Sequence, residues 1–441
     1  MRFDGFVLPS YFKRMTQSDL ARRLLGFIKN SPTPFHAVKS ITDLLQGFTK
    51  LEEGARWKLE AGGKYYVTRG DSSIVAFRMG TKAVVETGMR LVGAHTDSPG
   101  LHLRPVPEVA DRHYLRLGVE IYGGVLLSTW FDRDLSLAGR VFYARKGGKG
   151  IGQALIDFER AIAVVPNLAI HLNRAANENR TIQKQVEVVP LIAHASAKAG
   201  FHEAVLEELG RVGVKDAERV VSHDLSFYDT QDPAVVGLHG DFLASARLDN
   251  LLSCFAGTAA LIQAKAGPTQ VLVCNDHEEV GSVSWQGAQG TFLRSVLERV
   301  AGSAEDFTRA LSQSMLVSTD NAHGIHPAYP EKHESNHTPI LNHGPAIKTN
   351  TNQRYSTSAE TAAWIQECAG DAEVPLQSFV ARNDMGCGST IGPLTASVLG
   401  VRAVDLGVPT FAMHSAREMA GVHDVGHLAS VLEAFYGSER T

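Results

Sequence analysis

The spacing of apolar residues predicts alternating helices and strands near the start of the chain. Leucines recur with helical period among charged residues at 18–28, and a second helix should follow the break at 31–34. Short apolar, largely aliphatic runs at 73–77 and 89–94 predict buried strands, and the second run leads straight into His95.

The same alternation resumes after Ser245. It predicts helices at 248–265, 292–300, 304–314, 359–368 and from His427 onward, and strands at 271–274, 315–318 and 403–406. Helices and strands in turn are typical of a doubly wound sheet with helices on both faces. We therefore expect an α/β fold with a mixed sheet, formed by residues 1–100 and 240–441.

The middle of the chain has a different pattern. Between residues 102 and 236, apolar positions alternate or fall in β-branched segments, with one evident helix at 204–211. The predicted strands there are 113–117, 137–143 and 187–193. This pattern predicts a β-rich insertion domain over residues 101–239.

Composition narrows the class of protein. A chain of 441 residues exceeds one ordinary core, so two domains are expected. With 43 Lys plus Arg against 47 Asp plus Glu, and no basic stripe, we expect no nucleic-acid partner. We also expect no membrane span and no signal peptide. Four cysteines without zinc-finger or CxxC spacing suggest reduced thiols and a cytoplasmic location.

The segment NDHEEVG at 275–281 directly follows the apolar run at 271–274. It predicts a buried strand that delivers carboxylates to its carboxyl end, where open α/β sheets build their sites. Two adjacent glutamates are costly to bury unless a cation neutralises at least one. Glu279 or Glu278 could then bind a metal while the other acts as a base. The alternative is a solvated acidic turn.

Other side chains that suit divalent metals also stand at the boundaries of predicted elements. They are His95, Asp249, Asp320 and His414. One such residue alone is more often a core or capping residue. Two His, two Asp and one Glu at one sheet edge can hold two ions if one carboxylate bridges them. Asp97 either orients the His95 imidazole or forms an Asx-turn before Pro99.

Three further positions are candidates for substrate contact. His323 is the best placed of five histidines between residues 323 and 343. Tyr355 either hydrogen-bonds a substrate oxygen or packs in the core. Gly386, beside Cys387, would allow the backbone to approach the substrate closely. Cys387 has no evident base beside it, so we interpret it as a small residue of a tight loop.

Seven motifs in order resemble the M18 metallopeptidases, the aspartyl aminopeptidase family. They are GAHTDSPG at 93–100, SARLDN at 245–250, NDHEEVGS at 275–282, DNAHGIHPAYPEKHE at 320–334, IKTNTNQRY at 347–355, RNDMGCGSTIGP at 382–393 and MHSAREM at 413–419. The resemblance covers nearly the whole chain except the residues before Thr16. It implies a zinc-dependent aminopeptidase that removes N-terminal residues, often Asp or Glu, from peptides.

The resemblance also implies a role for each metal-site residue. One ion would take His95 and Asp320, the other Glu279 and His414, with Asp249 bridging both. Two such ions share a water and lower its pKa, so that Glu278 can accept its proton as general base. Zinc suits these ligands best, and cobalt or manganese would also suit them.

Two further implications concern specificity and assembly. Lys348 would place a cation in the pocket for the first side chain; otherwise it is a solvated surface lysine. The resemblance implies assembly through the insertion into dimers and then dodecamers. There His171 would reach the neighbouring subunit's active site and stabilise the oxyanion. The sequence alone favours a histidine paired within the insertion.

Two rival functions share some of these features. A related dinuclear deacylase or carboxypeptidase would have the same metal ligands but is expected to lack the motifs at 320–334 and 347–355. A non-catalytic scaffold would be expected to lack Glu278 or a ligand, and all of these residues are present.

Overall fold

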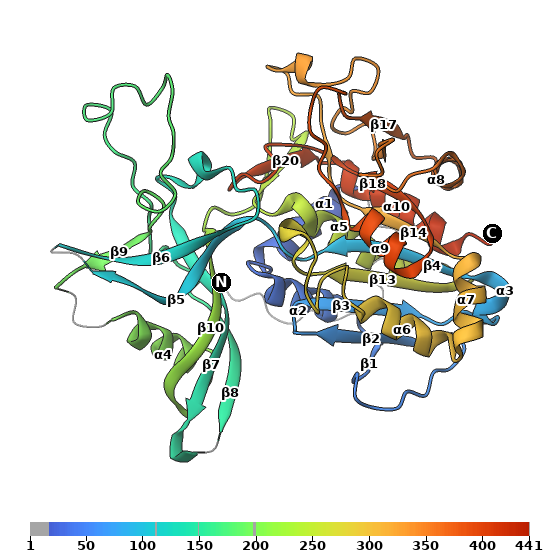
Figure 1. Cartoon of the computed structure of the whole chain (residues 1–441), viewed down its shortest axis with the longest axis horizontal. Helices are drawn as coiled ribbons and strands as arrows, with labels where there is room; N and C mark the ends of the chain where they lie inside the picture. Colours follow the sequence, from blue (N-terminus) through green and yellow to red (C-terminus); the bar gives the residue numbers. More distant parts are fainter. Residues whose placement is uncertain (1–16, 111–112, 149, 197–199, 441) are drawn as a thin grey trace.

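The computed structural model describes residues 17–110, 113–148, 150–196 and 200–440. The largest sheet has nine strands in the order β1-β2-β3-β13-β4-β14-β18-β16-β17 (Figure 1). Their bounds are Thr49–Lys50 (β1), Lys64–Arg69 (β2), Ser73–Arg78 (β3), Thr269–Asn275 (β13), Met89–His95 (β4), Met315–Thr319 (β14), Arg402–Gly407 (β18), Ala346–Thr349 (β16) and Gln377–Val380 (β17). Strands β13, β4, β14 and β18 are parallel neighbours, and antiparallel strands flank them. The predicted mixed sheet is confirmed.

Helices cover both faces of this sheet, with a hydrophobic core on each side. One core includes residues of α1 (Gln17–Lys29), α2 (Pro34–Leu44), α5 (Leu248–Gln263), α8 (Ala359–Asp371) and α10 (Asp424–Gly437). The other includes residues of α3 (Val84–Thr87), α6 (Phe292–Ala301), α7 (Ala304–Ser312) and α9 (Ile391–Leu399). Neighbouring strand residues divide between the cores, as Val92 and Leu91 of β4 do. The sheet is therefore doubly wound, as predicted.

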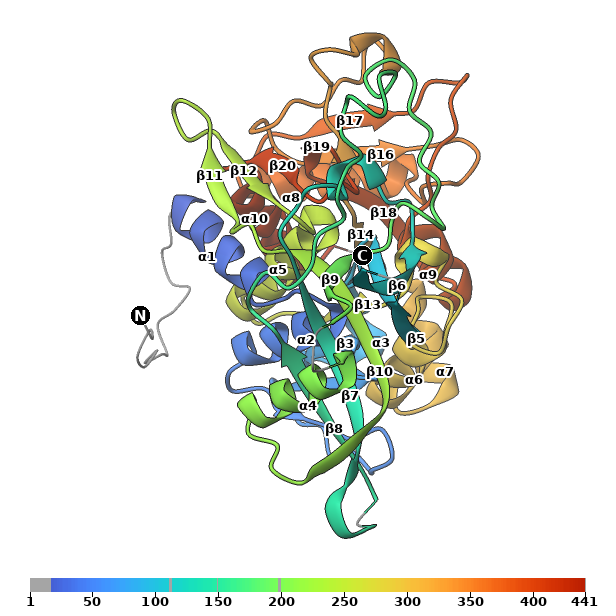
Figure 2. The same ribbon diagram turned by 90° about the vertical axis from the view of Figure 1, so that its left-hand side faces the viewer.

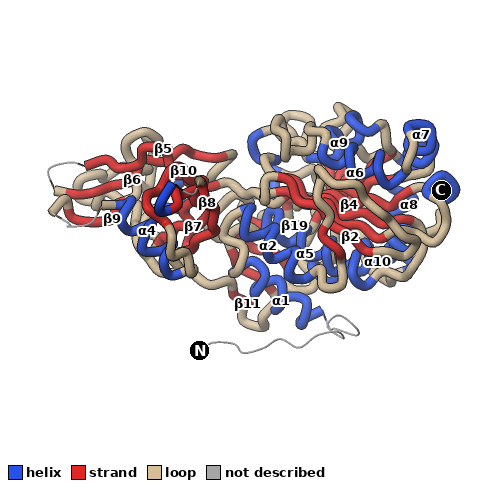
Figure 3. Tube along the Cα trace, turned by 90° about the horizontal axis from the view of Figure 1, so that it is seen from below, coloured by secondary structure: helices blue, strands red, loops and turns tan. Residues whose placement is uncertain are grey.

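A second, antiparallel sheet of six strands forms a separate lobe beside the first (Figure 3). Its order is β8-β7-β10-β5-β6-β9. The strands are Ile151–Asp157 (β8), Leu135–Arg145 (β7), Ala217–Asp229 (β10), Gly100–Ala110 (β5), Tyr114–Tyr122 (β6) and Leu191–His194 (β9). Helix α4 (Phe201–Arg211) packs in the core of this lobe. We refer to this lobe as the insertion.

Several expected boundaries differ from the structure; for example, the helix expected from 204 begins at Phe201. The strand predicted at 187–193 begins only at Leu191, because Pro190 has no N–H to donate to a sheet. The C-terminal helix begins at Asp424, three residues before the expected His427. No helix in the described part of the chain is both long and apolar enough to cross a bilayer.

A third sheet joins segments that are distant in sequence. Its five strands, in the order β11-β12-β20-β19-β15, lie along the upper part of Figure 2. They are Ala234–Val236, Phe242–Ser245, Glu418–Gly421, Pro409–Phe411 and Ala322–His323. The antiparallel register pairs Ser245 with Glu418, so the chain after β12 lies beside the start of β20. The sequence did not predict this sheet.

Candidate metal centre

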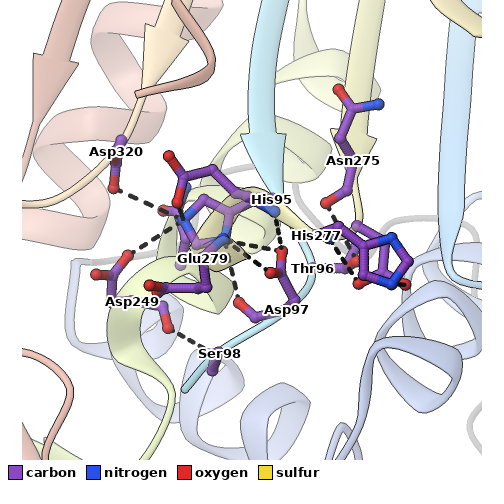
Figure 4. A network of polar contacts seen from close by, with 12 residues as sticks. His95, Thr96, Asp97, Ser98, Asp249, Asn275, His277, Glu279 and Asp320 are labelled. Atoms are coloured by element: carbon purple, nitrogen blue, oxygen red, sulfur yellow. Dashed lines mark hydrogen bonds and ion pairs between the residues drawn. The ribbon is translucent and has the colours of Figure 1, made fainter. Parts of the chain in front are cut away.

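Three of the predicted ligands follow neighbouring strands of the nine-stranded sheet. His95 ends β4, Glu279 lies in the turn after β13, and Asp320 follows β14. Because β13, β4 and β14 are parallel and adjacent, these strands end at the same edge. Figure 4 shows the three side chains converging there.

The other two predicted ligands come from the five-stranded sheet. Asp249 follows β12 at the irregular start of α5, where Arg247 has a φ of 58°. His414 follows β19 in a turn and has a φ of 68°. Positive φ values are unusual for residues other than glycine. Both ligands are therefore held by local backbone shapes that regular helices and strands do not supply.

These five side chains divide into two groups that meet at Asp249. His95 Nε2 lies 3.4 Å from Asp249 Oδ1 and 3.8 Å from Asp320 Oδ1. His414 Nε2 lies 3.4 Å from Asp249 Oδ2 and 3.3 Å from Glu279 Oε2. The two oxygens of one carboxylate thus face two different imidazoles.

Buried oxygen atoms show that a cation fits this cluster. Within the described residues, Asp249 Oδ1 and Glu279 Oε1 are buried without a hydrogen-bond partner, which is costly for a carboxylate. Atoms bound about 2.1 Å from a tetrahedral ion lie about 3.4 Å apart. Both histidines lie 3.4 Å from Asp249, and His414 lies 3.3 Å from Glu279, whereas His95 lies 3.8 Å from Asp320. Imidazole nitrogens with carboxylate oxygens form a donor set that suits zinc.

The charges of the cluster are unbalanced without a cation. Burial lowers the pKa of His95, but the neighbouring carboxylates of Asp249, Asp320 and Asp97 raise it well above its usual value. Burial and the charge of Asp249 raise the pKa of Glu279 well above its usual value. The carboxylates therefore compete for too little positive charge, which a divalent ion would supply.

Glu278 lies beside the cluster. Its Oε2 atom is 3.9 Å from His95 Nε2. Burial raises the pKa of Glu278 to about 8. The charge of His95 lowers this pKa, and the charge of Asp320 raises it. Its side chain is therefore placed to exchange a proton with a group bound at the cluster.

Asp97 contacts the cluster at His95 Nδ1, the ring nitrogen that does not face Asp249. His95 Nδ1 lies 3.0 Å from the Asp97 carbonyl oxygen and 3.3 Å from its Oδ1. The Asp97 carboxylate also accepts hydrogen bonds from the backbone N–H groups of Glu278 and Glu279, at 3.1 and 3.0 Å. One side chain thus touches a histidine of the cluster and fixes the turn that carries both glutamates.

The insertion reaches the cluster through the end of β6 and the residues that follow it. Tyr122 donates a hydrogen bond from its hydroxyl to Asp97 Oδ2 at 2.7 Å. Just after the strand, the carbonyl oxygen of Gly124 lies 3.1 Å from His414 Nδ1. A Cβ atom on Gly124 would meet the same nitrogen at 3.1 Å. Sequence analysis missed Tyr122, because nothing in its strand pattern distinguishes it.

Glu418 is a second residue that sequence analysis missed. Its carboxylate accepts hydrogen bonds from the backbone N–H groups of Asp249, at 2.8 Å, and His414, at 2.9 Å. The residue is only 2% exposed, and burial together with the charge of Asp249 raises its pKa to about 8. An acid at the start of the short buried strand EMAG was the available signal.

Lys348 is buried beside the cluster and is not a solvated surface lysine. It is 2% exposed, and its ammonium lies 3.1 Å from the Asn321 carbonyl oxygen and 3.7 Å from Asp320 Oδ2. The ring of Tyr355 lies 4.9 Å from the ammonium. Tyr355 itself is 5% exposed and belongs to a small core with Phe379.

The remaining substrate candidates, His323 and Gly386, are exposed. His323 is exposed at the end of β15, and its ring meets Phe379 edge-on, with centroids 5.7 Å apart. Gly386 is exposed, with open space where a Cβ would lie. The structure brings Lys348 and Tyr355 together, whereas Gly386 lies in an exposed loop.

His171 lies on an exposed turn of the insertion, in which the N–H groups of Leu172 and Asn173 both bond the Ala169 carbonyl oxygen. The surrounding segment 166–190 is a loop that projects at the upper left of Figure 1. Within the described residues the His171 ring has no hydrogen-bond or ion-pair partner. The alternative of a histidine paired inside the insertion is therefore not seen there.

Over most of its length the chain is similar in sequence to known metallopeptidases. The family model for the aminopeptidase I zinc metalloproteases (M18) matches residues 27–436. A "Probable M18 family aminopeptidase 2" of Ectopseudomonas mendocina is 57% identical over 426 residues, covering 96% of this chain and 99% of that protein.

Solved structures with the same fold include relatives of known assembly. A chain in the cryo-EM structure of the Ape4 and Nbr1 complex is 38% identical with a TM-score of 0.91, covering 96% of this chain and 86% of that one. A chain of the S. cerevisiae mApe1 dodecamer is 28% identical with a TM-score of 0.84, covering 96% and 97%.

Proposed function

The chain belongs to the M18 family of zinc metalloaminopeptidases, and we propose from this premise that it hydrolyses the N-terminal peptide bond of peptides at a centre of two metal ions. The observation that carries the proposal is the position of Asp249. Each of its carboxylate oxygens lies 3.4 Å from the Nε2 atom of a different histidine. A carboxylate so placed can bridge two ions, as in other dinuclear peptidases.

In this proposal each ion has its own histidine and its own acid. His95 and Asp320 would hold one ion, His414 and Glu279 would hold the other, and Asp249 would contribute to both. The unpartnered Asp249 Oδ1 and Glu279 Oε1 atoms support this division within the described residues. Two bound zinc ions supply a Lewis acid for the peptide carbonyl and lower the pKa of water toward neutrality. Cobalt or manganese would suit the same ligands.

Glu278 is the proposed general base. Its carboxylate accepts a proton from the attacking water and then donates that proton to the nitrogen of the leaving amine. The side-chain carboxylate lies 3.9 Å from His95 Nε2, and the backbone N–H is held 3.1 Å from Asp97 Oδ1. Asp97 would thus position the base and the neighbouring ligand Glu279 together.

Lys348 is the proposed source of a preference for N-terminal Asp or Glu. Its buried ammonium lies 3.7 Å from Asp320, so a substrate carboxylate near the metal centre would be within its reach. A cation this poorly solvated gains from a second negative partner. His323, Tyr355 and Gly386 complete the proposed substrate site around it.

Self-association through the insertion is the proposed state of assembly, in dimers that build a dodecamer. Loop 166–190 exposes large apolar side chains, with Leu168 57% and Leu172 74% exposed. A groove of about 980 Å³ runs beside them, lined in part by Ile170 and Val186. Exposed apolar surface of this kind is typical of protein interfaces. His171 would then enter the active site of a neighbouring subunit.

A panel of chromogenic substrates tests the proposed function. Protein reconstituted with zinc should release the chromophore from Asp-, Glu- and Leu-anilides, fastest from the acidic pair. The matched control is N-acetyl-Asp anilide, which lacks the free amino group and should resist cleavage. Release of acetate from the acetylated substrate would favour the deacylase alternative, and removal of residues from the carboxyl end of a peptide would favour the carboxypeptidase alternative.

A further inference from the structure

Glu418 joins two segments of the metal centre that lie far apart in sequence. Its Oε2 atom accepts the N–H of Asp249 at 2.8 Å, and its Oε1 atom accepts the N–H of His414 at 2.9 Å. Both hydrogen bonds are made to backbone, so Glu418 fixes the main chain from which the two side chains extend. No substrate or metal needs to touch it.

The two segments lie outside regular strand pairing, and other hydrogen bonds reach their carbonyl groups: Ser98 donates to the Asp249 carbonyl oxygen at 2.6 Å, and Leu126 donates to that of His414 at 3.0 Å. Arg247 precedes Asp249 with a φ of 58°, and Ala412 and His414 have φ values of 53° and 68°. Such conformations persist only where surrounding structure fixes them. Strand pairing brings Ser245 opposite Glu418 but ends there, so the chain that continues to Asp249 is outside the ladder.

We propose that Glu418 is a positioning residue that sets the separation of Asp249 and His414, and thereby the affinity of the ion that these two residues share with Glu279. This inference rests on the proposed function. Glu418 acts through both partners at once, because a carboxylate has an acceptor oxygen for each N–H group. Asp97 serves the opposite side of the centre through the N–H groups of Glu278 and Glu279.

The substitution Glu418→Gln isolates this role. Glutamine has nearly the same shape, but its amide has one acceptor oxygen and an NH2 group that cannot accept. One of the two backbone N–H groups must then lose its partner. Glu418→Asp keeps the charge and both oxygens on a shorter side chain, so it should fold even if the glutamine variant does not.

Asp424 offers a matched control. It is fully buried, and its carboxylate likewise accepts two backbone N–H groups, those of Asn342 at 2.7 Å and Gly344 at 3.0 Å. These partners are not among the proposed ligands. Asp424→Asn therefore reports the general effect of breaking such a pair on the stability of the fold.

The experiment measures zinc affinity by competition with a chelator, together with the melting temperature of the metal-free protein. Glu418→Gln should bind one of its two ions about 10–100-fold more weakly than the wild type, the usual range for partners of metal ligands. Added zinc should restore its kcat with KM unchanged, and Glu418→Asp should show a smaller loss of affinity. Asp424→Asn should keep wild-type zinc affinity for both ions.

Unchanged zinc affinity in Glu418→Gln and Glu418→Asp, with two ions bound to the wild type, would overturn this inference alone. An equal loss of affinity in Asp424→Asn would overturn it too, because the effect would then come from general destabilisation. A wild-type protein that binds fewer than two ions would overturn the proposed function as well.

Discussion

The nine-stranded sheet and the insertion contribute to the metal centre in different ways. Parallel neighbours β4, β13 and β14 end at one edge and bring His95, Glu279 and Asp320 together there. The insertion reaches the same centre through the Tyr122 hydroxyl, the Gly124 carbonyl oxygen and the N–H of Leu126, which donates to the His414 carbonyl oxygen at 3.0 Å. Parallel strands collect several side chains at one edge. The antiparallel sheet of the insertion contributes single contacts from one strand end.

This comparison suggests a division of labour within one chain. The nine-stranded and five-stranded sheets together would hold the ions and the base, and the insertion would orient these residues and contact other subunits. Four substitutions test the division, beginning with the one expected to have the largest effect.

Glu278→Gln should retain both ions and lower kcat by roughly 10³-fold, because only the proton acceptor is removed. Metal analysis alongside kinetics with an aminoacyl anilide measures this. Glu279→Gln is the control, since it should lose metal and activity together. Substantial turnover in Glu278→Gln with two ions bound would assign the base to another residue.

His171→Ala tests whether the insertion also supplies a group that takes part in the reaction. If it does, the insertion of one subunit would have a catalytic role in the active site of another, beyond orientation and assembly. Loss of a hydrogen bond to the oxyanion should lower kcat by at least about 100-fold without changing metal content. His202→Ala, an exposed histidine on α4 of the same lobe, should leave kcat unchanged.

Mixed oligomers make the His171 test sharper. If His171 acts across an interface, mixing His171→Ala with Glu278→Gln subunits should restore part of the activity. Some sites would then combine an intact Glu278 with a neighbour's His171. Demonstrated subunit exchange without any recovery would place His171 outside the mechanism or in its own subunit's site.

Lys348→Ala should reduce kcat/KM for N-terminal Asp and Glu by about 1.5–3 kcal/mol, the scale of a hydrogen bond to a charged group. Leu-anilide should be much less affected. Lys332→Ala, an exposed lysine, controls for a general change in charge. Equal losses on acidic and neutral substrates would show that Lys348 supports Asp320 rather than selecting the substrate.

Tyr122→Phe should have the smallest effect, because Asp97 keeps its two backbone donors. Loss of the hydroxyl should weaken zinc binding by about tenfold. Tyr228→Phe is the matched control, since its hydroxyl bonds Asp157 within the insertion at 2.6 Å. If both variants bound zinc like the wild type, the insertion would have no orienting role through this contact.

The local pattern of apolar residues was sufficient to predict many helices and strands of the fold. The apolar runs at 89–94 and 271–274 lie in β4 and β13, because buried parallel strands need continuous apolar sequence. The same pattern failed at 187–193, where one proline interrupts the strand. It also missed the five-stranded sheet, whose β11, β15 and β19 have only two or three residues each. Strands that short leave too few positions for an alternation to be recognised.

The sequence by itself determined which chemical groups the chain carries and that they follow strand ends, since both are properties of neighbouring residues. It predicted His95, Asp249, Glu279, Asp320 and His414 as one set, and the structure brings these side chains together. The tertiary structure decided how they divide around Asp249.

Only the tertiary structure identified Glu418 and Tyr122 as residues that hold the centre in place. Glu418 accepts from Asp249, 169 positions earlier, and Tyr122 reaches Asp97 from another sheet. Lys348 proved to be buried beside Asp320. Helical and strand periods are local, whereas these contacts depend on which strands pair, in which register, and how separate sheets pack. No pattern within a short window of sequence contains that information.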